Sequence, residues 1–266
     1  MKNQKSVYLA WRAHNEYRTW APVGRLDRWG KNLYFFSYTK GADQTGFKPF
    51  LGMENIKAVY RSNTMFSMFS NRLLNSKRAE YRSVLDWSGF DDETHPDPLA
   101  ILEVTEGRRS TDYFEVFPRP TPDDAGLYRF RFFLHGIERL SDLAKDRVAL
   151  LQSGERLLCM LDVQNSYDSN AVALRTEDDR QIVGYLPRYL AQDFGELATG
   201  RGIEDVSFEV KRLNGDAPLQ FRVLCDLQAS WPDEYVPFQS EAFEPVSEFN
   251  TASPQYDEHP DLVEVG

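Results

Sequence analysis

The sequence contains few cysteines and no long hydrophobic run. Its two cysteines, Cys159 and Cys225, lie in apolar, strand-like stretches. This is too few for a disulfide-stapled secreted fold, so we expect buried thiols in a reducing compartment. No apolar run approaches the roughly 18 residues of a membrane-spanning helix, and the first residues lack the apolar stretch of a secretory signal. We therefore expect a cytoplasmic protein with no membrane partner.

The motifs of common enzyme and metal sites are also missing. There is no phosphate-binding P-loop, nucleophile elbow, kinase catalytic loop or HExxH zinc motif. The four histidines are scattered. The acidic stretches DDET and DDRQ fall in predicted loops, without the clustered carboxylates that a metal-dependent nuclease needs. The sequence predicts a non-enzymatic protein with no metal and no cofactor.

Composition and charge indicate a folded chain with an uneven surface. Hydrophobic residues make up 41% of the sequence and aromatic residues 14%, enough for a real core. The net charge of −10 combines a basic stretch over residues 1–90 with an acidic one over residues 231–266. The first third can therefore meet an anionic partner, unless charges of both signs serve only to keep the surface soluble.

Proline and glycine divide the chain into modules. The stretch PRPTPDDAG, residues 118–126, is typical of an exposed linker. We expect one module over 1–117, a second over 127–230, and a flexible or partner-dependent acidic tail over 231–266.

The first module reads as strands and helices. VYLAW, NLYFFSYT and FEVFP are strand-like and bounded by glycine or proline. SNTMFSMFSNRLL has apolar residues near a 3.6 period, which predicts a helix capped by Ser62 or Asn63. AEYRSVLDWSGF predicts a helix ending near Gly89, and DPLAILEVTEG one from Pro98 to Gly107.

The second module alternates short strands with two helices. YRFRFFLHGI and RLLCMLDV are strand-like, and AVALRTEDDRQIVGYL predicts a hairpin. DVSFEVKRL and LQFRVLCDL predict another, turning at Asn214-Gly215. One helix is predicted after Ser141, and another from Pro187 to Gly200. The fold class is therefore α+β, with an N-terminal α+β module joined to a small β-barrel.

The turn NSYDSNAV and the later IVGYLPRYLA resemble the HIRAN domain family. The resemblance covers about residues 130–228 and implies an SH3- or OB-like β-barrel. The best-understood members, attached to DNA-remodelling helicases, hold the 3′-hydroxyl end of single-stranded DNA. The matching residues are Asn165, Tyr167, Asp168, Asn170, Ala171, Val172, Gly184, Tyr185 and Leu186.

The resemblance implies a role for each site residue. Tyr167 would stack on a terminal base, and Asp168 would accept a hydrogen bond from the sugar hydroxyl. Asn165 would fix the turn or contact the same sugar, while Tyr185 and Arg188 would lie near the phosphate. The predicted DNA-binding set is Asn165, Tyr167, Asp168, Asn170, Tyr185 and Arg188.

Two observations keep a structural interpretation of this set open. Asn and Asp side chains often bond local backbone in turns, and Tyr167 could simply cover the barrel end. The first strand also reads HGIERL, with Glu138 and Arg139, where DNA-holding members have an aromatic residue, and the domain is net negative. This departure leaves weak DNA binding or a different ligand open.

About residues 7–115 resemble the N-terminal subdomain of HipA-like toxin kinases. VGRLDRW, NLYFFSYTKGA, MFSMFSNRLL and DPLAILEVTEG match in order. The resemblance implies docking on a HipA-like serine/threonine kinase that lacks this subdomain. Methionine and aromatic residues are enriched in such interfaces, but here they can equally form the module's own core. The predicted partner-binding residues are Phe66, Phe69, Asn71 and Arg72.

Together the two resemblances favour an antitoxin-like protein that restrains such a kinase and binds single-stranded DNA. The alternative is a DNA-end-binding accessory protein in DNA repair or phage defence. The identity of the neighbouring gene, a kinase or a helicase, separates the two hypotheses.

Overall fold

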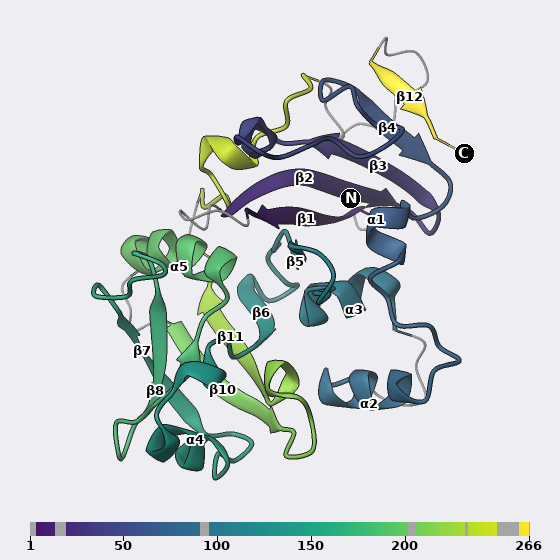
Figure 1. Cartoon of the computed structure of the whole chain (residues 1–266). Helices are drawn as coiled ribbons and strands as arrows, with labels where there is room; N and C mark the ends of the chain where they lie inside the picture. Colours follow the sequence, from purple (N-terminus) through teal and green to yellow (C-terminus); the bar gives the residue numbers. More distant parts are fainter. Residues whose placement is uncertain are drawn as a thin grey trace. The chain divides into compact units, whose positions relative to one another are not determined.

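The computed structural model describes residues 4–13, 20–90, 96–201, 206–231, 234–248 and 261–265. The chain forms two compact units (Figure 1). Unit 1 comprises Met1–Leu74, Pro98–Arg119 and Phe238–Gly266, and unit 2 comprises Asn75–Asp97 and Pro120–Pro237. Each unit combines a six-stranded sheet with short helices, which confirms the α+β class. Residues 249–260 of the predicted tail, and the stretch DDET, lie outside the described residues.

Unit 1 is built on a sheet with the strand order β12-β4-β3-β2-β1-β5. Neighbouring strands are antiparallel, except that β12 runs parallel to β4. Apolar side chains of α1 and α3 join those of the strands in one core. The elements are β1 (Gln4–Arg12), β2 (Trp20–Trp29), β3 (Leu33–Tyr38), η1 (Lys40–Asp43), β4 (Val59–Ser62), α1 (Ser67–Ser70), α3 (Pro98–Thr105), β5 (Phe114–Pro118), η5 (Glu241–Phe243) and β12 (Leu262–Glu264).

Strand β2 was not predicted, because its proline and glycine look like strand boundaries. Pro22 pairs with Ala10 at a register shift in β1, and a bulge is where a strand tolerates proline. At Gly24, a Cβ atom would lie 2.5 Å from the Phe36 ring. Glycine is therefore needed here so that the ring can pack flat on the strand.

The helix predicted over SNTMFSMFSNRLL is much shorter than expected. Only Ser67–Ser70 is helical. Ser62 ends strand β4 instead of capping a helix, and Phe66 has an extended ψ of 143°. The apolar residues of this stretch pack on the sheet core from a mostly irregular segment. By contrast, α3 starts at Pro98, and Gly107 follows it with a φ of 52°, as predicted.

The described residues of the tail predicted as flexible belong to the two units: 231 and 234–237 to unit 2, and 238–248 and 261–265 to unit 1. The ring centroids of Phe238 and Phe243 lie 5.5 Å and 5.1 Å from that of Tyr8. The Nζ atom of Lys40 lies 2.7 Å from a carboxylate oxygen of Glu244. The prediction of a flexible tail is therefore corrected for residues 238–248, where Phe238 and Phe243 are buried and Glu241 and Glu244 pair with Lys40.

Unit 2 is built on an antiparallel sheet with the strand order β6-β11-β10-β7-β8-β9. A bridge between His135 and Tyr185 joins the chain after β6 to β9, so the two ends of the sheet meet. The elements are α2 (Glu80–Trp87), β6 (Leu127–Phe133), η2 (Ile137–Arg139), α4 (Asp142–Val148), β7 (Arg156–Leu161), β8 (Val172–Thr176), β9 (Ile182–Tyr185), α5 (Arg188–Arg201), β10 (Val206–Leu213), η4 (Leu219–Phe221) and β11 (Val223–Ser230).

Helix α2 belongs to unit 2, although it was expected inside the first module. The ring centroids of Trp87 and Phe221 lie 6.0 Å apart, and Asn214 donates a hydrogen bond of 3.1 Å to the Trp87 carbonyl. The module boundary differs from the expected one because these contacts link residues far apart in sequence.

The remaining elements of unit 2 follow the sequence closely. The Ser141 hydroxyl caps α4 by accepting from the Ala144 amide. Both predicted hairpins form, β8–β9 and β10–β11. Helix α5 was expected to stop before Gly200 but continues through it to Arg201. Both cysteines are free, and Cys225 is fully buried.

Candidate functional site

The turn between β7 and β8 is organised by Asn165. Its side-chain oxygen accepts the backbone amides of Tyr167 (3.0 Å) and Asp168 (3.2 Å). Its side-chain nitrogen donates to Asp162 at 3.0 Å. Because both ends of the amide are engaged within the turn, Asn165 fixes the backbone that presents the next residues.

Asp162, which the sequence did not single out, connects this turn to β9. One carboxylate oxygen accepts from both the Asn165 amide and the Tyr185 hydroxyl, the latter at 3.1 Å. Partial burial and this hydrogen bond raise the pKa of Tyr185. Tyr185 is half-buried and forms the backbone bridge to His135. Its structural role is therefore to hold the turn against the sheet.

Asp168 lies between its own turn and helix α5. One oxygen accepts the Asn170 amide at 3.0 Å, and the other lies 3.4 Å from Nε of Arg188, the first residue of α5. Strong bonds between charged groups are about 2.7–2.9 Å long, so this ion pair is loose. The Asp168 side chain is 16% exposed. One carboxylate oxygen can therefore still accept a donor from a ligand.

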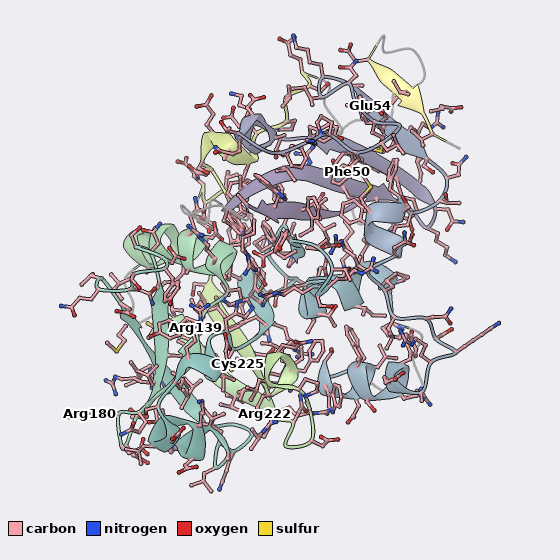
Figure 2. The ribbon with its side chains drawn as sticks, in the orientation of Figure 1. Phe50, Glu54, Arg139, Arg180, Arg222 and Cys225 are labelled. Carbon is pink, nitrogen blue, oxygen red and sulfur yellow. The ribbon has the colours of Figure 1, made fainter. Side chains whose placement is uncertain are left out.

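Tyr167 is the exposed aromatic residue of the turn. It is 49% exposed, and the Arg139 guanidinium carbon lies 4.2 Å from its ring centroid. Arg139 ends the short η2 helix and is labelled in Figure 2. A cation over an exposed ring contributes about 0.5–1 kcal/mol, enough to orient the ring while leaving much of it accessible.

Two glycines allow these segments to approach one another. Gly136 precedes η2 with a φ of 74°, and a Cβ atom there would lie 3.0 Å from the Tyr185 ring. A Cβ atom at Gly184 would lie 2.9 Å from the Cβ atom of Leu134. The chain after β6 and strand β9 can approach this closely because both positions lack a side chain.

The predicted DNA-binding residues thus divide into two groups. Tyr167, Asp168 and Arg188 form an accessible cluster, which Arg139 completes. Asn165 and Tyr185 hold the turn that carries the cluster, through their hydrogen bonds within the turn and to Asp162. Asn170 is exposed, and its backbone amide donates to Asp168. The cluster therefore pairs the Tyr167 ring with the Arg139 guanidinium and, at the next residue, the Asp168 carboxylate with the Arg188 guanidinium.

The residues predicted to bind a partner in unit 1 serve mainly its own packing. Phe66 and Phe69 are 6% and 0% exposed and belong to the core. The Arg72 side chain is 5% exposed and donates to Asp112 at 2.8 Å, and burial lowers its pKa. Only Asn71 is exposed. The predicted partner role of the other three residues is therefore corrected to a role in the core.

Within the described ranges, no cluster of three His, Cys, Asp or Glu residues could hold a metal ion. Over the same residues, no helix has the length and hydropathy needed to cross a membrane.

Comparison with known proteins gives a match over unit 2. The family model described as "HIRAN domain" matches residues 127–231, which confirms that resemblance. A crystal structure of a protein from Lactobacillus plantarum aligns with 19% identity and a TM-score of 0.30, covering 39% of this chain and 97% of that one. The HIRAN domain of human HLTF aligns with 15% identity and a TM-score of 0.30, covering 40% and 81%. No curated protein matches the chain.

Proposed function

We propose that the HIRAN-matching residues 127–231 bind single-stranded DNA and hold a 3′-hydroxyl end at the turn between β7 and β8. The observation that carries the proposal is the family match itself. Within the matched residues, the turn between β7 and β8 presents the exposed Tyr167 next to the carboxylate of Asp168. The resemblance to HIRAN domains that hold DNA ends implies this ligand.

The chemistry of the cluster fits a strand terminus. The Tyr167 ring offers a stacking face, which any base can use. Arg139 and Arg188 supply positive charge for the phosphates. Asp168 would repel a terminal phosphate but accept a hydrogen bond from a free hydroxyl. The carboxylate therefore gives selectivity through a penalty on the wrong end.

Replacing Asp168 with alanine is expected to remove the preference for a hydroxyl end. We expect the unchanged protein to bind a 3′-hydroxyl oligonucleotide on the order of tenfold more tightly than its 3′-phosphorylated twin, since hydrogen bonds to charged groups contribute about 1.5–3 kcal/mol. Fluorescence anisotropy with both oligonucleotides measures the ratio.

Asp178→Ala is the matched control. It removes the same charge from an exposed position near the tip of the β8–β9 hairpin, so it should keep the preference. Equal affinity of the unchanged protein for the two ends would contradict end recognition. A preference that survives Asp168→Ala would show that another group reads the hydroxyl.

The two arginines are expected to set the salt dependence of binding. For single strands, each neutralised phosphate contributes about −0.7 to the slope of log K against log salt. Arg139→Gln and Arg188→Gln should therefore each flatten the slope by about 0.7. Arg180→Gln, at the exposed tip of the β8–β9 hairpin (Figure 2), should leave the slope unchanged. Titrations at several salt concentrations check this, and unchanged slopes for all three variants would exclude phosphate contact by this cluster.

Restraint of a HipA-like kinase stays a prediction from the resemblance over residues 7–115. The family match covers residues 127–231, outside unit 1, and the side chains of three of the four residues predicted to contact the kinase are buried. Co-purification with the product of a neighbouring kinase gene, combined with growth rescue, would check it. The alternative accessory role in DNA repair or phage defence needs only the DNA-binding activity proposed here.

A further inference from the structure

The β4 edge of the unit 1 sheet is occupied by a short segment of the same chain. Figure 1 shows β12 beside β4. Leu262, Val263 and Glu264 pair in parallel with Val59, Tyr60 and Arg61. Further backbone bonds extend the pairing at both ends: the Val59 amide donates to the Asp261 carbonyl, and the Val265 amide to the Arg61 carbonyl, each at 2.9 Å. Residues 261–265 therefore engage the strand edge as an added peptide strand would.

The side chains of this segment contact the sheet in a defined pattern. Leu262 packs against the cluster formed by Phe35 and Val59, and Val265 packs against the main core. A carboxylate oxygen of Glu264 lies 3.4 Å from Arg61. Val263 is 39% exposed, more than Leu262 or Val265. The edge therefore accommodates an extended segment with an aliphatic residue, any residue, an acidic residue and an aliphatic residue in that order, as in residues 262–265.

The edge also continues beyond the paired residues. A cavity of about 190 Å³ lies at the downstream end of the segment. Its lining residues are Arg61, Ser62, Asn63, Thr64, Glu264 and Val265. This cavity therefore presents polar side chains and Arg61 to the residue that follows the second aliphatic position of a bound segment.

The contact between β12 and the β4 edge is small, but the covalent connection of β12 to the rest of the chain favours its binding there. β12 has only three residues, Glu264 is 78% exposed in its ion pair, and exposed ion pairs contribute little. A segment joined covalently to its site has an effective concentration in the millimolar range. A weak cis contact can therefore keep the edge filled and still yield to a better-matched competitor.

We propose that the β4 edge is a docking site for an extended segment of a partner protein with the pattern aliphatic–any–acidic–aliphatic, kept closed in cis by residues 261–265. The partner adds a strand to the sheet, its acidic residue pairs with Arg61, and its aliphatic residues replace Leu262 and Val265. This proposal is independent of DNA binding by unit 2.

The test uses the labelled peptide HPDLVEVG, the sequence of residues 259–266, as the probe. Two variants open the edge: a chain ending at residue 260, and the full chain carrying Leu262→Asp. Both are expected to bind the peptide at least tenfold more tightly than the unchanged chain, because the tethered competitor is gone. A peptide with lysine at the glutamate position should bind weakly, and Arg61→Glu in the shortened chain should restore its binding.

Three outcomes would overturn the proposal. The first is no peptide binding by either variant while hydrogen exchange shows that Leu33–Tyr38 remains protected. The second is loss of that protection in both variants, which would make the segment an integral part of the fold. The third is a concentration-dependent dimer of the unchanged chain in light scattering that Leu262→Asp abolishes, which would assign the edge to a second copy.

Discussion

Replacing Tyr167 with alanine is expected to weaken the binding of a single-stranded oligonucleotide by about 5- to 150-fold. The estimate follows from base–aromatic stacking, which contributes about 1–3 kcal/mol per base. Tyr167 carries this effect because it is the aromatic residue exposed at the turn, and Arg139 already holds its ring in place. Equilibrium anisotropy titrations at fixed salt provide the measurement.

Two further variants make this experiment specific. Tyr167→Phe keeps the ring and should retain most of the affinity. Tyr113→Ala removes a tyrosine with the same 49% exposure from unit 1 and should leave binding unchanged. If all three variants bound the oligonucleotide equally, base stacking on this turn would be ruled out. That conclusion would hold regardless of the result for Asp168→Ala.

Replacing Phe69 with alanine is expected to destabilise unit 1 by about 3–5 kcal/mol, as for other large-to-small changes in a core. Phe69 is fully buried, and its ring centroid lies 6.1 Å from that of Phe36. Hydrogen exchange of Leu33–Tyr38 should accelerate at least about 100-fold. The readout is local, so it is not confused by the stability of unit 2.

Asn71→Ala is the control for this change, because it alters an exposed residue two positions away. Its exchange should match that of the unchanged chain. Normal protection in Phe69→Ala would mean that this ring is dispensable to the stability of the core.

Local signals in the sequence predict many of the elements. Pro98 at the start of α3, Ser141 as the cap of α4, and Gly89 and Gly107 after their helices all act within one or two turns of chain. Such signals depend on local backbone preference or on bonds to nearby residues, so they can be recognised without knowing the tertiary fold.

Long-range contacts account for the elements that could not be predicted. Pro22 is a strand residue because it pairs with Ala10 at a register shift, and Gly24 is one because the Phe36 ring packs against it. The stretch around Met65 has helical periodicity, yet most of it packs in irregular form against the sheet. No local pattern records either arrangement.

The same limit applies to the candidate site. The turn with Tyr167 and Asp168 stands out as a motif, whereas Asp162 and Arg139 become recognisable only through the residues they contact. Asp162 stands three residues before Asn165, a spacing common in turns. Arg139 is separated from Tyr167 by a helix and a strand, so only the folded sheet brings them together.

The aromatic residues near the C-terminal end complete the core that the N-terminal strand begins. Phe238 and Phe243 pack on Tyr8 and Phe117, while residues 120–237 belong to unit 2. During synthesis on a ribosome, unit 2 can therefore finish folding before Phe238 and Phe243 emerge to cover Tyr8 and Phe117. We therefore expect unit 1, which begins first, to be completed last, with the Tyr8 and Phe117 rings uncovered until that point.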